Sequence, residues 1–106
     1  MSLTPAPAGR HPDLVDRGVV VTGGASGIGL ATAARFVAEG SRVVVLDRDT
    51  ARLAQLESEL TGLAGVVEVD VSDGEAVAAA FNEVDRLVVR LDVLVANAGI
   101  SLLHRF

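Results

Sequence analysis

The feature of this sequence that most restricts its fold is a set of four short apolar runs, each separated from the next by a segment with helical spacing. The runs are apolar at consecutive positions rather than at alternate ones, which is typical of strands covered on both faces in a parallel sheet. They span residues 19–22, 42–46, 66–69 and 93–96. The alternation predicts the α/β class, with a doubly wound parallel sheet, right-handed crossovers and helices on both faces.

The three segments between the runs predict helices, because their apolar residues recur every three or four positions. We expect these helices over residues 27–39, 50–60 and 72–90. In the first of them, Ile28 belongs to the set of apolar positions. The third begins with the S-x-x-E pattern of a capping box, in which Ser72 would cap the helix and Glu75 would return the hydrogen bond.

The N-terminal segment and the composition limit the domain organisation and the classes of partner. All three prolines lie within residues 1–12, so we predict a loose extension over residues 1–16 and a folded part over residues 17–106. A formal net charge of −5 argues against nucleic acid or an anionic membrane as a partner. The absence of cysteine excludes disulfides and a thiolate nucleophile, and no metal site is predicted. With no membrane-spanning run and no signal-peptide pattern in the sequence, we expect a cytoplasmic protein.

Glycine and polar residues follow each apolar run, at the edge of the predicted sheet where open α/β proteins bind their ligands. The first run leads into the sequence TGGASGIG over residues 22–29. Gly23 would permit a tight turn, Gly27 would let the backbone approach a diphosphate, and Gly29 would let the helix pack closely on the sheet. Free N–H groups at the start of the helix would then face the phosphates.

Asp47 follows the second run and lies eighteen residues beyond Gly29. A carboxylate there can accept both hydroxyls of an adenosine ribose and repels a 2′-phosphate, which favours NAD over NADP. Arg48 lies next to it and could bind that phosphate, but we expect the repulsion from Asp47 to dominate.

Spacing removes one alternative and leaves another open. The P-loop of nucleotide hydrolases requires a lysine, and the sequence has none, so that class is excluded. The order of glycines is G-x-x-x-G-x-G and differs from the usual dinucleotide fingerprint G-x-G-x-x-G. A methyltransferase-like site for S-adenosylmethionine also uses a glycine-rich turn and an acidic strand end, so it stays open at this point.

Taken together, the motifs resemble the N-terminal, cofactor-binding part of the short-chain dehydrogenase/reductase family. Residues 22–29 match the family pattern TGxxxGIG, and Asp47 lies where NAD-preferring members carry their ribose-binding aspartate. Residues 91–100 resemble the LDxLVNNAGI segment, with Ala96 in place of its first asparagine. The resemblance implies that Asp70 and Val71 meet the adenine ring and that Asn97 braces the central strand. The predicted cofactor-binding residues are Gly23, Ser26, Gly27, Ile28, Gly29, Asp47, Arg48, Asp70, Val71, Asn97, Ala98 and Gly99.

The resemblance also implies a fold and an activity. The fold would be a Rossmann-like sheet in the order 3-2-1-4, truncated after its fourth strand. The activity would be hydride transfer between a nicotinamide dinucleotide and a small alcohol or carbonyl substrate, in an enzyme expected to be a homo-oligomer. The family's catalytic Tyr and Lys lie in its second half, and this sequence contains neither residue type, so we assign no catalytic residue and expect the chain alone to be inactive. The alternative is a catalytically inactive dinucleotide-binding or interaction module with the same fold.

Overall fold

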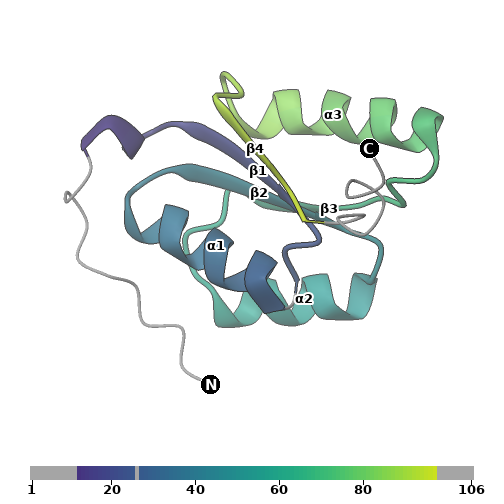
Figure 1. Ribbon diagram of the computed structural model, residues 1–106, viewed down its shortest axis with the longest axis horizontal. Coiled ribbons are helices and arrows are strands. Elements are labelled where there is room, and N and C mark those ends of the chain that lie inside the picture. Colours follow the sequence, from purple (N-terminus) through teal and green to yellow (C-terminus); the bar gives the residue numbers. More distant parts are fainter. Residues whose placement is uncertain (1–11, 26, 98–106) are drawn as a thin grey trace, which may run out of the picture.

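The four apolar runs form one parallel sheet in the computed structural model, which describes residues 12–25 and 27–97. Their order across the sheet is β3-β2-β1-β4, as the family resemblance implied (Figure 1). Each neighbouring pair is parallel, so all four carboxyl ends reach the same edge. The strands are β1 (Gly18–Thr22), β2 (Arg42–Asp47), β3 (Gly65–Glu68) and β4 (Val93–Ala96).

Burial follows the position of each strand in the sheet. All of β1 is buried, and so are the four residues of β2 from Val43 to Leu46, because both strands have neighbours on either side and helices on either face. In β4 the residues alternate between half-buried and exposed, and Leu94 keeps 53% of its accessible surface. Among the described strands β4 pairs only with β1, so its other side is an open edge.

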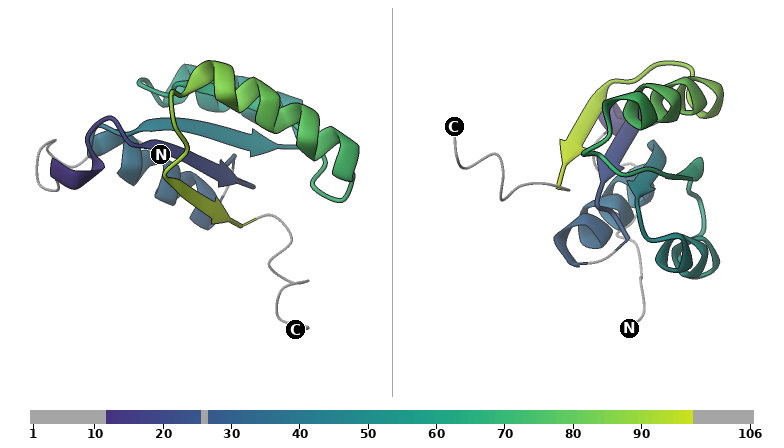
Figure 2. Two further views of the ribbon diagram at one scale, coloured as in Figure 1. Left: turned by 90° about the horizontal axis from the view of Figure 1, so that it is seen from above. Right: turned by 90° about the vertical axis from the view of Figure 1, so that its right-hand side faces the viewer.

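Helices cover both faces of the sheet, which confirms the doubly wound arrangement (Figure 2). On one face, Val19 and Val21 pack in a cluster with α1 (Gly27–Ala38) and α2 (Thr50–Glu59), and on the other, Val20 packs in a cluster with α3 (Gly74–Leu87). Consecutive residues of a strand point to opposite faces, so a run of valines supplies both apolar layers. The helical elements are a short 3₁₀ turn η1 (Pro12–Leu14), α1 (Gly27–Ala38), α2 (Thr50–Glu59) and α3 (Gly74–Leu87). None of these helices is long and apolar enough to cross a membrane.

The start of α3 corrects the predicted capping box. Asp73, not Ser72, caps the helix, because its carboxylate reaches the backbone N–H groups of Glu75 at 3.1 Å and Ala76 at 3.2 Å. Ser72 instead donates its hydroxyl to the Asp70 carboxylate at 2.7 Å. The helix also ends at Leu87 rather than near residue 90.

The described N-terminal residues make more contacts than a loose extension over residues 1–16 would make. The carbonyl oxygen of Leu14 accepts a hydrogen bond from the Ser41 hydroxyl. The Asp16 N–H donates to the carbonyl oxygen of Gly40 at 2.9 Å. Contacts with the folded part therefore begin before residue 17, while residues 1–11 lie outside the described part of the chain.

Candidate functional site

The glycine-rich turn, residues 22–29, joins the carboxyl end of β1 to the start of α1. Gly23 has a φ of +64°, which an L-residue adopts only at a cost, so the tight turn predicted there is present. Its N–H donates to the carbonyl oxygen of Leu46 at 2.7 Å. The first peptide of the turn is therefore attached to β2 as well as to β1.

Two further glycines allow close packing beneath the turn. A Cβ at Gly29 would lie against the carbonyl oxygen of Gly23, far inside contact distance, so α1 can approach the turn only with glycine at this position. A Cβ at Gly24 would lie 2.8 Å from Cγ1 of Val45. The motif spacing predicts the role of Gly29 but not that of Gly24, because spacing alone does not show that a β2 side chain fills this space.

Gly27 differs from these glycines because its surroundings are open. It has a φ of +60°, and a Cβ built there meets no atom of the described residues within 4 Å. Gly27 begins α1, whose first four N–H groups have no partner within the helix, and the next residue, Ile28, is 77% exposed. Ile28 is therefore not part of the buried face of α1, in contrast to the apolar pattern used to predict the helix. Ser26 lies outside the described residues.

Asp47 ends β2 and binds the backbone of two turns. Its Oδ2 accepts from the N–H of Ala25 at 3.3 Å, and its Oδ1 accepts from the N–H of Asp49 at 3.1 Å. Its own carbonyl oxygen accepts from the N–H of Val69 at 3.0 Å. The structure thus brings the predicted ribose-binding carboxylate directly beside the glycine-rich turn, and Ala25 is a contact that the sequence analysis did not name.

Asp70 and Val71 follow β3 at the same edge of the sheet and are both exposed. The side-chain and backbone hydrogen bonds from Ser72 hold the pKa of Asp70 below its usual value, and the positive charge of Arg48 lowers it further. Arg48 is exposed and belongs to this electrostatic environment. Asp70 is one of the two residues predicted to meet adenine. Its lowered pKa keeps it ionised to a lower pH than a free aspartate.

Asn97 follows β4, and its N–H donates to the carbonyl oxygen of Thr22 at 3.2 Å. Its Nδ2 is buried and has no hydrogen-bond partner among the described residues. This backbone contact joins the end of β4 to the start of the glycine-rich turn. The glycine-rich turn, Asp47 and Asn97 therefore meet at one edge of the sheet. Ala98 and Gly99 lie outside the described part of the chain.

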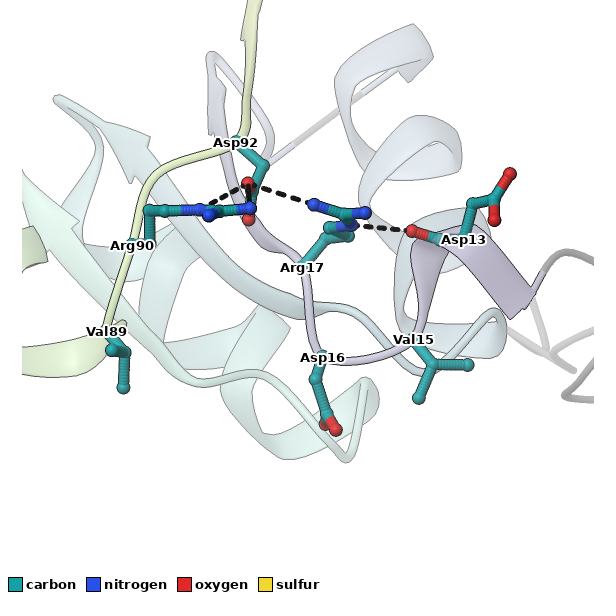
Figure 3. Close-up of a pocket in the computed structure, with 7 residues that line it drawn as sticks. All are labelled: Asp13, Val15, Asp16, Arg17, Val89, Arg90 and Asp92. Atoms are coloured by element: carbon teal, nitrogen blue, oxygen red, sulfur yellow. Dashed lines mark hydrogen bonds and ion pairs between the residues drawn. The ribbon is translucent and has the colours of Figure 1, made fainter.

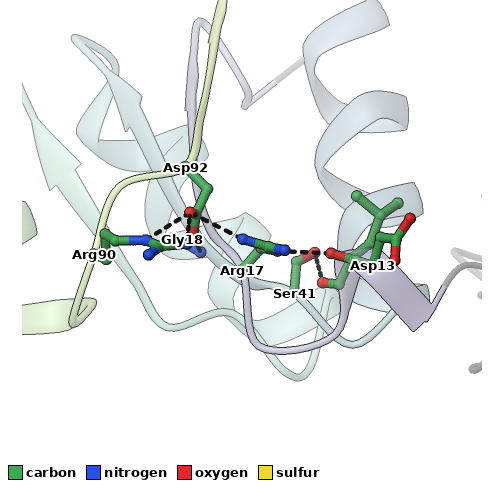
Figure 4. Close-up of polar contacts among 7 residues, drawn as sticks. Asp13, Arg17, Gly18, Ser41, Arg90 and Asp92 are labelled. Carbon is green, nitrogen blue, oxygen red and sulfur yellow. Dashed lines mark hydrogen bonds and ion pairs between the residues drawn. The ribbon is translucent and has the colours of Figure 1, made fainter.

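A cavity of about 450 Å³ lies at the opposite edge, near the amino ends of β1 and β4 (Figure 3). Arg17, Arg90 and Asp92 are among its lining residues. The Asp92 carboxylate lies 3.3 Å from the Arg17 guanidinium and 2.7 Å from that of Arg90 (Figure 4). Because one carboxylate engages both arginines, this edge offers a weaker anion site than its positive residues suggest.

Asp92 also supports the sheet at this edge. Its Oδ2 accepts from the N–H of Gly18 at 3.0 Å, and its own N–H donates to the Gly18 carbonyl oxygen at 2.8 Å. The Gly18 hydrogen bond and then that of Arg90 lower the pKa of Asp92, and the charges of Arg90 and Arg17 act in the same direction. The contacts of Asp92 with Arg17, Gly18 and Arg90 therefore connect β1 to β4.

The groups at the carboxyl edge suit an anion and hydroxyl groups. Within residues 12–25 and 27–97, no group of three or more histidine, cysteine or acidic side chains is placed to hold a metal ion. The start of α1 offers N–H donors beside an open glycine, and Asp47 supplies acceptor oxygens a short distance away. Such a site can hold a diphosphate at the helix and hydroxyl groups at the carboxylate.

Comparison with known proteins gives the same family as the motifs. The family model described as short chain dehydrogenase matches residues 17–106. The 3-oxoacyl-[acyl-carrier-protein] reductase MabA of Mycobacterium tuberculosis is 44% identical over 96 residues, which cover 91% of this chain and 36% of that protein. The 2-dehydro-3-deoxy-L-rhamnonate dehydrogenase (NAD(+)) of a Sphingomonas species is 42% identical over 94 residues, with coverage of 89% and 36%.

A solved structure agrees with these matches. The crystal structure of a short chain dehydrogenase from Mycobacterium smegmatis superposes with a TM-score of 0.78 at 34% identity, and the match covers 92% of this chain and 41% of that one. The chain thus spans 36% of the length of each of the two curated relatives described above.

Proposed function

Because the chain belongs to the short-chain dehydrogenase/reductase family, a family of oxidoreductases, we propose that it is the part of such an enzyme that binds a nicotinamide dinucleotide. The observation that carries the proposal is the glycine-rich turn at the start of α1, with an open Cβ position at Gly27 beside N–H groups that have no partner within the helix. The similarity to oxidoreductases favours this function over an inactive module and over a methyltransferase-like site.

The residues at the carboxyl edge fit the two halves of the ligand. The diphosphate would lie over Gly27 and the first N–H groups of α1, where the helix dipole also favours negative charge. The adenosine ribose would lie at Asp47, and the adenine would lie near Asp70 and Val71. The buried Nδ2 of Asn97 has no partner among the described residues, so this side chain can donate to a further group at the same edge.

We propose NAD rather than NADP as the cofactor. A carboxylate at Asp47 accepts ribose hydroxyls and repels a 2′-phosphate. A relative that is 42% identical is an NAD(+) dehydrogenase by name, which supports the same choice.

The chemistry of the proposed enzyme belongs to the bound dinucleotide, which exchanges a hydride with an alcohol or carbonyl compound. The residues of this chain would bind and orient the dinucleotide. The sequence contains no tyrosine and no lysine, so any proton transfer through those side chains requires residues outside it. We therefore propose that the chain by itself has no dehydrogenase activity. We further propose that the active enzyme is a homo-oligomer in the cytoplasm.

Titration of the purified chain with NAD and NADP by calorimetry tests the proposal. We expect binding of NAD with lower affinity for NADP, and we expect Gly27→Ala to weaken NAD binding at least tenfold, because a methyl group would enter the space proposed for the diphosphate. Gly40→Ala is the matched control, because Gly40 also has a positive φ, +86°, but lies at the far end of α1. Each change strains the backbone by about 1–2 kcal/mol. Equal NAD affinity in the Gly27→Ala variant and the unmodified chain would show that the turn does not hold the diphosphate.

A further inference from the structure

Asp47 is distinguished from the other aspartate at the carboxyl edge by the distance that its contacts span in the sequence. Asp70 binds the backbone and hydroxyl of Ser72, two residues away. Asp47 binds Asp49 in the same way but also binds Ala25, which is 22 residues earlier. Of these contacts, only the one between Asp47 and Ala25 joins the end of a strand to the glycine-rich turn.

The contact with Ala25 acts on the middle of the turn. The beginning of the turn is held by the bond from the Gly23 N–H to Leu46, and the end is held by the close packing of Gly29. Ala25 lies between them, is only 6% exposed, and donates its N–H to Oδ2 of Asp47 at 3.3 Å. Without that acceptor, the described part of the chain offers no other side chain that binds the middle of the turn.

We propose that Asp47 is a positioning residue for the diphosphate, because it fixes the backbone of the glycine-rich turn through the N–H of Ala25. This inference rests on the proposed function. It does not compete with ribose binding, because a carboxylate has about four acceptor positions and the two backbone bonds occupy two of them. The bond from the Asp49 N–H to the other oxygen also restricts the orientation of the carboxylate.

The two roles of Asp47 are separated by a ligand that lacks the ribose hydroxyls. If Asp47 acts only on the ribose, its removal changes the affinity for ADP but not for 2′,3′-dideoxy-ADP. If Asp47 also positions the turn, Asp47→Ala weakens the binding of both nucleotides. Asp47→Asn keeps one oxygen that can accept from the Ala25 N–H, but its NH2 group cannot accept from the Asp49 N–H, so it restores part of the affinity for the dideoxy nucleotide.

The experiment compares both nucleotides by calorimetry on the unmodified chain and on the Asp47→Ala, Asp47→Asn and Asp49→Ala variants. We expect Asp47→Ala to weaken the binding of 2′,3′-dideoxy-ADP at least tenfold, and the affinity of Asp47→Asn to lie between those of Asp47→Ala and the unmodified chain. Asp49→Ala is the matched control in the same loop: it removes the side chain that caps α2 but keeps the N–H that binds Asp47. Equal affinity of Asp47→Ala and the unmodified chain for the dideoxy nucleotide overturns the proposal.

Hydrogen exchange of the Ala25 N–H gives a second measurement that needs no ligand. We expect exchange at least tenfold faster in Asp47→Ala, a smaller increase in Asp47→Asn, and an unchanged rate in Asp49→Ala. An unchanged Ala25 rate in Asp47→Ala overturns the proposal even where nucleotide binding is too weak to measure. If the unmodified chain bound neither ADP nor NAD, the proposed function would fail on that result alone, and the exchange rates would still decide whether Asp47 holds the turn.

Discussion

The two edges of the sheet use an aspartate in similar ways but in different electrostatic surroundings. At the carboxyl edge, Asp47 accepts from the N–H of Ala25, just after β1, and at the amino edge, Asp92 accepts from the N–H of Gly18, the first residue of β1. Asp92 also forms ion pairs with Arg17 and Arg90. For Asp47, no arginine lies within ion-pair distance in the part of the chain that the structure describes.

This difference separates a structural edge from a ligand-binding edge. The charge of Asp92 is compensated, its side chain keeps 15% of its accessible surface, and its oxygens bind groups of the protein. Asp47 is half-buried and retains acceptor positions, and the turn beside it offers N–H donors in an open space. The carboxyl edge therefore depends on the charge of Asp47, which has no ion-pair partner among the described residues, whereas the amino edge depends on contacts already formed within the protein.

The largest effect is expected where the turn packs most closely, so the first test of the comparison is Gly29→Ala. A methyl group there would press on the carbonyl oxygen of Gly23 and move α1 away from the turn. Overpacking of this kind costs about 1–3 kcal/mol or more. We expect a lower free energy of unfolding in urea and at least a tenfold loss of NAD affinity.

Gly74→Ala is the control for the change at Gly29. Gly74 also lies in the first turn of a helix, but a Cβ there meets no atom within 4 Å in the part of the chain that the structure describes, and its φ is not positive. Alanine favours a helix over glycine by about 1 kcal/mol, so this variant should be at least as stable as the unmodified chain. If Gly29→Ala retained the stability and NAD affinity of Gly74→Ala, the turn would not depend on close packing.

At the amino edge, Asp92→Asn should have a smaller effect than Gly29→Ala. It should lower the stability of the protein without changing its affinity for NAD. Asparagine keeps an oxygen that can accept from the Gly18 N–H but removes the charge that binds Arg17 and Arg90. We expect a lower midpoint of thermal unfolding at pH 7 and an unchanged affinity for NAD. A loss of NAD affinity at unchanged stability would remove the distinction between the two edges.

The pH dependence of the same variant isolates the charge of Asp92. The folded-state pKa of Asp92 lies below its ordinary value of 3.8, so its carboxylate contributes stability that is fully present above pH 3.8. That contribution is lost as the pH falls through the folded-state pKa, because the proton then binds the folded protein too. The stability difference between the unmodified chain and Asp92→Asn should therefore be constant near neutrality and shrink in acid, as measured by urea unfolding at a series of pH values.

The fold could be predicted from the sequence because the two central strands are apolar at consecutive positions. Only strands covered on both faces require this, and β1 and β2 are buried on both. The start of α3 could not be predicted as well, because Ser72 and Asp73 can both cap a helix. The choice depends on Asp70, whose carboxylate binds Ser72 and leaves Asp73 to cap the helix.

The candidate site was predicted in its residue types but not in its connections. The motif indicated Gly23, Gly29 and Asp47 at one edge, and the structure brings them together. The motif did not indicate that Asp47 binds Ala25, or that Val45 fills the space under Gly24, because both contacts join residues about twenty positions apart. Contacts of this kind depend on the register between β1 and β2, which a single sequence does not specify.

The smallest expected effect concerns the charge state of Asp70 at the carboxyl edge. The hydroxyl of Ser72 is the largest cause of the lowered pKa of Asp70, ahead of the Ser72 N–H and the charge of Arg48. Ser72→Ala removes the hydroxyl but keeps the N–H, so we expect the pKa of Asp70 to rise toward its ordinary value in an NMR titration of the carboxyl carbon. Arg48→Gln should raise it less. If Arg48→Gln raised the pKa more than Ser72→Ala, Asp70 would be a charge-compensated carboxylate like Asp92, and the difference drawn between the two edges would hold for Asp47 alone.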